Sequence, residues 1–121
     1  MATYSRQLLS GSTNGQPVKV AATAIGSGTT IHTAVSGTSS FDEIYLWVTN
    51  TSSSAVALTI GWGGTTDPDS LVCDAVTIPP SSDCPPIPIV AGLVLQNSLI
   101  VKAAAGTTNV LLLTGYVNRI A

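Results

Sequence analysis

The fold is decided by the stretch FDEIYLWVTN at residues 41–50, in which apolar side chains recur at every second position. One face of this extended segment carries Ile44, Leu46 and Val48, and the opposite face carries Tyr45 and Trp47. Because both faces are substantially apolar, we expect a central strand that is covered on both sides or whose second face meets a partner.

A second alternating stretch follows closely, at residues 56–62, where Val56, Leu58 and Ile60 share one face. The four residues 51–54 between the two stretches are all Thr or Ser. Two alternating segments joined by a short polar turn are typical of an antiparallel β-hairpin. The sequence therefore predicts a hairpin over residues 41–62.

Further runs rich in β-branched residues alternate with turn formers along the rest of the chain. They cover residues 18–20, 29–35, 71–78, 93–95, 99–103 and 109–118. No stretch shows a sustained helical period with capping residues. About eight short strands with frequent turns predict an all-β fold, a single antiparallel β-sandwich of jelly-roll or immunoglobulin-like type over residues 17–121.

Residues 1–16 are polar and glycine-bearing, which favours a flexible N-terminal arm. The arm nevertheless holds Tyr4, Leu8 and Leu9, apolar groups that a purely solvated tail does not need. We therefore expect the arm to lie across a neighbouring subunit and to add backbone hydrogen bonds at a sheet edge.

Residues 79–88 hold five prolines, which excludes a central strand because proline donates no hydrogen bond to a β-ladder. We expect an extended surface loop there, stiff enough to lose little entropy on docking. The residues predicted to contact a partner are Tyr4, Leu8, Leu9, Tyr45, Trp47, Pro85, Pro86 and Pro88.

The composition favours an interaction module over an enzyme. Only 8% of the 121 residues are charged, 45% are hydrophobic, and there is one histidine. The cations stand singly in the sequence and the net charge is −2, so we expect no nucleic-acid partner. The longest apolar run, near residues 110–113, is far shorter than a membrane-spanning helix requires, so we expect no membrane partner either.

The residues that could take part in catalysis or bind a metal have simpler structural interpretations. His32 stands in the middle of a predicted strand and is interpreted as a structural histidine. Asp42 and Glu43 are adjacent on a strand and point to opposite faces, so they cannot act as a glycosidase pair. Asp67 and Asp69 favour a turn over a calcium loop. We therefore predict no catalytic residue, no metal site and no cofactor.

Two pairs of residues allow alternatives. Cys73 and Cys84 are close enough in sequence for a loop-closing disulfide, although a pair of free thiols in a reducing cytosol is the favoured interpretation. Trp47 and Trp62 are candidates for an aromatic platform that binds sugars, and core packing is favoured for at least one of them.

Three segments carry a resemblance to a known class of proteins. GTTIHTA (28–34) followed by DEIYLWVTN (42–50) looks like the front half of small virion structural proteins of tailed bacteriophages, and LTGYVNRI (113–120) is similar to their closing strand. The likeness covers residues 28–64 and 108–120 and is greatest to capsid decoration (cement) proteins.

The resemblance implies a non-enzymatic protein on the capsid exterior that is synthesised in the host cytoplasm. Such a protein bridges subunits of the major capsid protein. Around threefold positions of a capsid, a homotrimer is the simplest of the homo-oligomers we expect. The alternatives are a head–tail connector or tail component of the virion and, in a different class, a carbohydrate-binding β-sandwich module.

Overall fold

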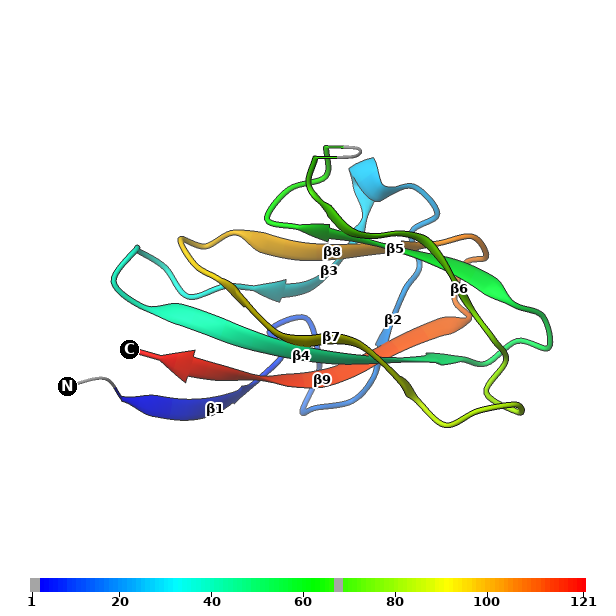
Figure 1. Cartoon of the computed structure of the whole chain (residues 1–121), viewed down its shortest axis with the longest axis horizontal. Coiled ribbons are helices and arrows are strands. Elements are labelled where there is room, and N and C mark those ends of the chain that lie inside the picture. Colours follow the sequence, from blue (N-terminus) through cyan, green and yellow to red (C-terminus); the bar gives the residue numbers. More distant parts are fainter. Residues whose placement is uncertain (1–2, 67–68) are drawn as a thin grey trace.

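The structure, a computed structural model, describes residues 3–66 and 69–121 as two antiparallel β-sheets that pack against each other (Figure 1). Its strands are β1 (Tyr4–Leu8), β2 (Val18–Lys19), β3 (Thr29–Thr33), β4 (Phe41–Asn50), β5 (Val56–Trp62), β6 (Leu71–Ile78), β7 (Ile87–Leu95), β8 (Ile100–Ala105) and β9 (Leu111–Ile120). A single 3₁₀ turn, η1 (Ile25–Ser27), precedes β3, and the described residues form no α-helix. The predicted all-β sandwich is confirmed.

The strand order identifies a jelly roll. Sheet A has the order β1-β9-β4-β7, with β2 pairing to the same edge of β9 as β1, and sheet B has the order β3-β8-β5-β6. From β2 onward the partners are therefore β2 with β9, β3 with β8, β4 with β7 and β5 with β6. This nested pairing arises when one long antiparallel hairpin is rolled into two sheets, which is the jelly-roll pattern and not the immunoglobulin one.

The core lies between the two sheets and is built from the alternating residues of β4 and β5. Ile44, Leu46 and Val48 of β4 are completely buried, as are Leu58 and Ile60 of β5. β4 lies between β9 and β7, so the prediction of a central strand is confirmed.

The predicted hairpin over residues 41–62 is wrong, because β4 and β5 belong to different sheets. Alternation predicts that one face of a strand is buried. Two such strands can bury these faces as neighbours in one sheet or by packing against each other from opposite sheets of a sandwich. Asn50, only 1% exposed, stabilises the crossing connection. Its Nδ2 donates to the carbonyl oxygens of Ser54 and Ile78, both at 2.9 Å, and its Oδ1 accepts from the Ser52 N–H at 3.0 Å.

The predicted flexible arm is also corrected by the structure. Residues 4–8 form β1, the edge strand of sheet A, in register with β9 from Tyr4 opposite Ile120 to Leu8 opposite Tyr116. Leu9, expected to contact a partner, is 2% exposed and belongs to the core. The arm pairs within its own chain because the ten-residue strand β9 offers a free edge long enough for both β1 and β2.

The proline-rich segment is a loop over residues 79–86, two residues shorter than predicted, because β7 begins at Ile87. Pro88 stands in β7, an edge strand of sheet A that pairs with β4 on one side only. Proline is tolerated in such a strand because the side without a partner strand needs no N–H donor. A hydrogen bond from the Ser81 N–H to the Asn50 carbonyl, 2.8 Å long, ties this loop to the end of β4.

Candidate partner-binding surface

The outward side of sheet A carries stacked aromatic side chains over its two central strands. Tyr45 of β4 lies directly opposite Tyr116 of β9, with ring centroids 5.0 Å apart and 21° between the ring planes. Trp47, two residues along β4, stacks on the same Tyr116 at 6.0 Å and 29°. All three side chains are half-buried, so they pack against one another and still face solvent.

This cluster continues to the end of the sheet where β4 begins. Phe41 lies opposite Ile120 of β9, and Ile120 lies opposite Tyr4 of β1. We call the resulting surface the aromatic face; it consists of Phe41, Tyr45, Trp47, Tyr116 and Ile120.

The few polar groups beside the aromatic face are engaged with it. The Arg6 guanidinium lies over the Tyr116 ring, 4.6 Å from its centroid, a cation–π arrangement. The Tyr45 hydroxyl donates a hydrogen bond of 2.7 Å to the Glu43 carboxylate. This hydrogen bond favours the protonated phenol and raises the pKa of Tyr45 above 10.0. The aromatic face therefore presents little free charge to a partner.

The stacking bears on the sugar-platform alternative. A sugar packs on the exposed side of an aromatic ring, and one side of the candidate Trp47 is engaged in stacking on Tyr116. Trp62 lies in sheet B, packs against the core and donates its indole N–H to the Val94 carbonyl at 3.2 Å. The core interpretation is thus confirmed for Trp62, and the two tryptophans do not share one surface.

The other predicted contact residues fall in several places. Pro88 lies opposite Trp47, so it borders the aromatic face, while Pro85 and Pro86 are exposed in the loop at residues 79–86. Tyr4 and Leu8 are exposed on β1, 73% and 58% respectively. The structure therefore brings Tyr45, Trp47 and Pro88 together.

Tyr116 and Phe41, which the structure places on the same face as Tyr45 and Trp47, are absent from the residues predicted from the sequence. Tyr116 stands in an alternating segment, and that period-2 pattern places it on the face opposite Val117. The pattern cannot show that Tyr116 and Tyr45 are neighbours, because that depends on the register of β9 against β4.

A buried polar cluster sits on the inner side of the same sheet. The Asp42 carboxylate, with no exposed surface, accepts hydrogen bonds from Arg119 Nε at 2.7 Å and Arg119 Nη2 at 3.0 Å. His32 Nδ1 accepts from the Ser10 N–H at 3.0 Å, so the ring proton is on Nε2, which donates to Asp42 Oδ2 at 2.8 Å. Both nitrogens of His32 are thus engaged in holding three strands and the segment after β1 together, as expected of a structural histidine.

The hydrogen bonds to Asp42 make the stability of the protein depend on pH in the acidic range. Burial favours the neutral carboxyl, but the hydrogen bonds from Arg119 and His32 outweigh burial and hold the pKa of Asp42 below 3.8. A carboxyl with a lowered folded-state pKa contributes stability that is fully present above the unfolded-state pKa and is lost as pH falls through the folded-state value.

We therefore expect the difference in unfolding free energy between the wild type and Asp42→Asn to be constant near neutral pH and to shrink below pH 3.8. Urea unfolding of both proteins from pH 7 down to pH 2 measures this difference. A difference that stays the same over the whole range would contradict the assignment of the acid-sensitive group to Asp42.

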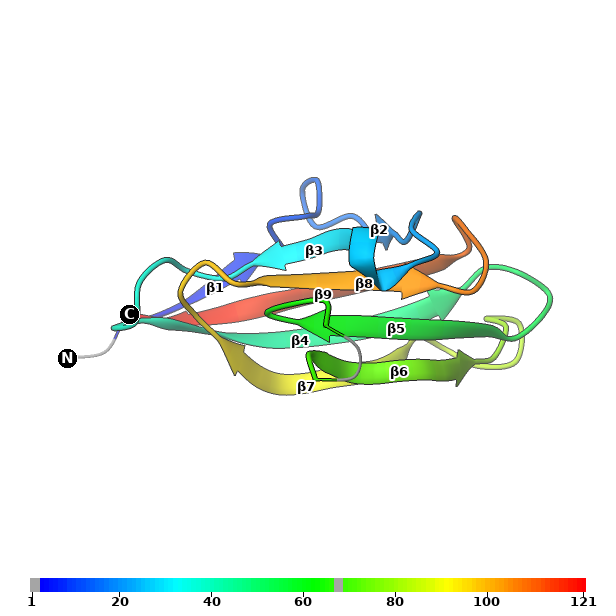
Figure 2. The same cartoon turned by 90° about the horizontal axis from the view of Figure 1, so that it is seen from above.

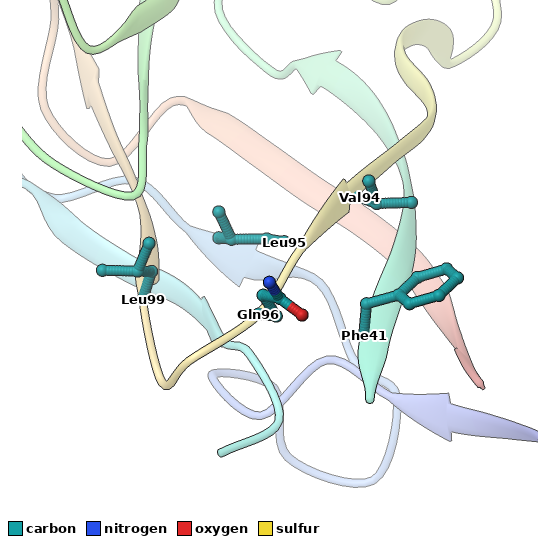
Figure 3. A pocket seen from close by; sticks show the side chains of 5 residues that line it. All are labelled: Phe41, Val94, Leu95, Gln96 and Leu99. Atoms are coloured by element: carbon teal, nitrogen blue, oxygen red, sulfur yellow. The ribbon is translucent and has the colours of Figure 1, made fainter. Parts of the chain in front are cut away.

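A shallow cavity of about 350 Å³ opens at the end of the sandwich where β4 begins and β7 ends (Figure 3). Its lining side chains are Phe41, Val94, Leu95, Gln96 and Leu99. Four of these five are apolar and none ionises, so this cavity offers no group for acid–base or nucleophilic chemistry.

The two cysteines are free thiols, so the disulfide alternative is not realised. Cys73 of β6 points into the core, where burial raises the pKa of its thiol above 9.0. Cys84 lies in the loop at residues 79–86 and directs its sulfur to the Pro80 carbonyl at 3.6 Å. The two side chains therefore have separate environments, which agrees with the favoured interpretation.

Within residues 3–66 and 69–121, no three acidic, histidine or cysteine side chains gather in a way that would hold a metal ion. Asp67, which together with Asp69 was considered as part of a calcium loop, lies outside the described residues. No helix in the described part of the chain has the length and hydropathy to cross a membrane. Comparison with protein-family models, curated proteins and solved structures finds no match for this chain.

Proposed function

We propose that this protein is a virion structural protein of a tailed bacteriophage, which decorates the capsid exterior and bridges subunits of the major capsid protein. The observation that carries this proposal is the aromatic face, a set of stacked, half-exposed side chains on the outward side of sheet A. Interface cores are enriched in Tyr, Trp and Phe and depleted in charge. The aromatic face has both properties.

The jelly roll suits this role. It is a fold that viral capsid proteins use, although fold alone never fixes function, and lectin domains use it as well. Trp62 packs against the core and Trp47 stacks on Tyr116, which favours a protein partner over a sugar. Because the chain is poor in charge, burying its surface at capsomer boundaries costs little desolvation, so many weak contacts can add up.

Capsid particles assembled without this protein provide the direct test. We expect the purified wild-type protein to bind them at hundreds of copies per particle, which separates decoration from a connector or tail position. Trp47→Ala should weaken binding at least about 30-fold, because truncating a central interface aromatic commonly costs 2 kcal/mol or more. Binding is measured by co-sedimentation with the particles and quantitative mass spectrometry.

Thr30→Ala is the matched control, since Thr30 is exposed on β3 of the other sheet, and it should bind like the wild type. Saturation at about a dozen copies or fewer would favour the connector or tail position. Equal binding by Trp47→Ala and the wild type would exclude the aromatic face as the capsid contact.

A further inference from the structure

Exposed apolar side chains gather on two opposite long sides of the sandwich. One side is the edge of sheet A formed by β1 and β2, and the other contains the edge strands β6 of sheet B and β7 of sheet A (Figure 2). The first side exposes Tyr4 and Leu8, at 73% and 58%. The second exposes Val72, Val76, Leu93 and Val94, at 39–51%.

The same two sides carry opposite charge. Lys19 is exposed on β2, and Arg6 is exposed on β1, where its guanidinium keeps its charge while it lies over the Tyr116 ring. The opposite side exposes Asp74 on β6, together with Asp69 and Asp83 in the segments that flank β6. We call the β1–β2 side the basic edge and the β6–β7 side the acidic edge.

The remaining described charges do not disturb this asymmetry. Arg119 is bound to Asp42, and Glu43 accepts hydrogen bonds from Tyr45 and Asn118 on the outward side of sheet A. Lys102 is half-buried on β8, a central strand of sheet B. Among the described residues, no ion pair links an acidic residue to Arg6 or Lys19.

We propose that the basic edge of one copy of this chain binds the acidic edge of the next copy, head to tail. The apolar side chains on each edge supply the buried area, and the opposite charges orient the two copies and favour their encounter. The occupant is a second copy because a single molecule carries both complementary surfaces. Two different surfaces that bind each other form a ring when the rotation between copies closes.

The strand directions are compatible with this contact. In sheet A, β9 is antiparallel to β1, β4 is antiparallel to β9, and β7 is antiparallel to β4. β7 therefore runs opposite to β1, so a copy placed beside β7 in the same orientation presents its β1 as an antiparallel neighbour. Leu8 lies opposite Tyr116 and Val94 lies opposite Glu43, so the proposed contact runs along the two margins of the aromatic face. The inference does not depend on whether the centre of that face binds a capsid.

The experiment uses two variants that each disable one edge. Leu8→Glu places a charge in the apolar part of the basic edge, and Val94→Glu does the same at the acidic edge. Analytical ultracentrifugation at about 100 µM and low ionic strength should show a discrete oligomer for the wild type, and each variant alone should be monomeric or dissociate at least about 30-fold more readily. An equimolar mixture of the two variants should form a 1:1 dimer, since each protein retains the edge that the other has lost.

Ser53→Glu, on an exposed turn between β4 and β5, is the control and should assemble like the wild type. Raising the salt concentration from about 50 mM to 0.5 M should weaken wild-type assembly about 10-fold, because exposed opposite charges are screened. Thermal unfolding checks that the variants are folded. If the Leu8→Glu variant does not fold, Lys19→Glu takes its place.

A wild-type protein that stays monomeric at about 100 µM would overturn the proposal. Variants that assemble like the wild type would overturn it as well. A mixture that stays monomeric while each variant has lost assembly would show a symmetric contact in place of a head-to-tail one.

Discussion

Asp42→Ala is expected to lower the free energy of unfolding by about 3 kcal/mol, because breaking a buried ion pair leaves its partners without compensation. Asp42 accepts hydrogen bonds from Arg119, from His32 Nε2 and, at 3.1 Å, from the Val35 N–H. Its removal leaves the His32 ring and the Val35 N–H without an acceptor. Urea unfolding at pH 7, followed by tryptophan fluorescence, measures the change.

Glu43→Ala is the matched control, because it removes the next carboxylate along the same strand. Glu43 faces outward and is half-buried, so we expect a loss below about 1 kcal/mol. Equal losses for the two variants would mean that the buried cluster contributes no more than a surface carboxylate does.

Gly115→Ala is expected to destabilise the protein by about 3 kcal/mol or to prevent folding, since overpacking in a tightly packed region costs 1–3 kcal/mol and sometimes more. Gly115 of β9 lies opposite Leu46 of β4, in the centre of sheet A. A Cβ there would overlap the carbonyl oxygen of Tyr45 and lie 3.2 Å from the Cα of Leu46. These are backbone atoms of a central strand, which cannot move aside as a flexible side chain would.

Gly26→Ala is the control for this substitution. Gly26 lies in η1, has no atom within 4 Å of an added Cβ, and does not require a left-handed backbone conformation. We expect a change between zero and a gain of about 1 kcal/mol, because alanine restricts the unfolded chain. Thermal and urea unfolding of both variants decide the comparison, and a similar loss for both would contradict the steric argument at Gly115.

The strands of this protein could be predicted from the sequence much better than their partners. The run rich in β-branched residues at 71–78 locates β6. Period-2 alternation locates β4 and β5 at their observed residues, because it reports which side of a strand is buried. It does not report which strand lies alongside, so the pairing of 41–50 with 56–62 was wrong. The side-chain amide of Asn50, which stabilises the crossing between sheets, gives no recognisable signal in a run of Thr and Ser.

The same limit applies to the candidate surface. Tyr45 and Trp47 were predicted as contacts from their place on the second face of β4, and their stacking on Tyr116 depends on strand register. The opposite error occurred at Leu9, where the polar composition of residues 1–16 concealed a strand followed by a core residue. The composition of a segment does not show whether it forms a strand, because an edge strand forms wherever a neighbouring strand has unpaired backbone N–H and C=O groups.

The nested pairing of the jelly roll has a consequence for the nascent chain on the ribosome. Tyr4 pairs with Ile120 and Val18 with Leu113, so β1 and β2 have no partner until β9 has been synthesised. Among the described strands, β5 and β6 are the only partners that follow one another directly in the chain. Because closing a short loop is faster than closing a long one, we expect this pair to form first during translation and the strands paired with β9 to form last. Until then the apolar side chains of β4 stay accessible to chaperones of the cell that makes the protein.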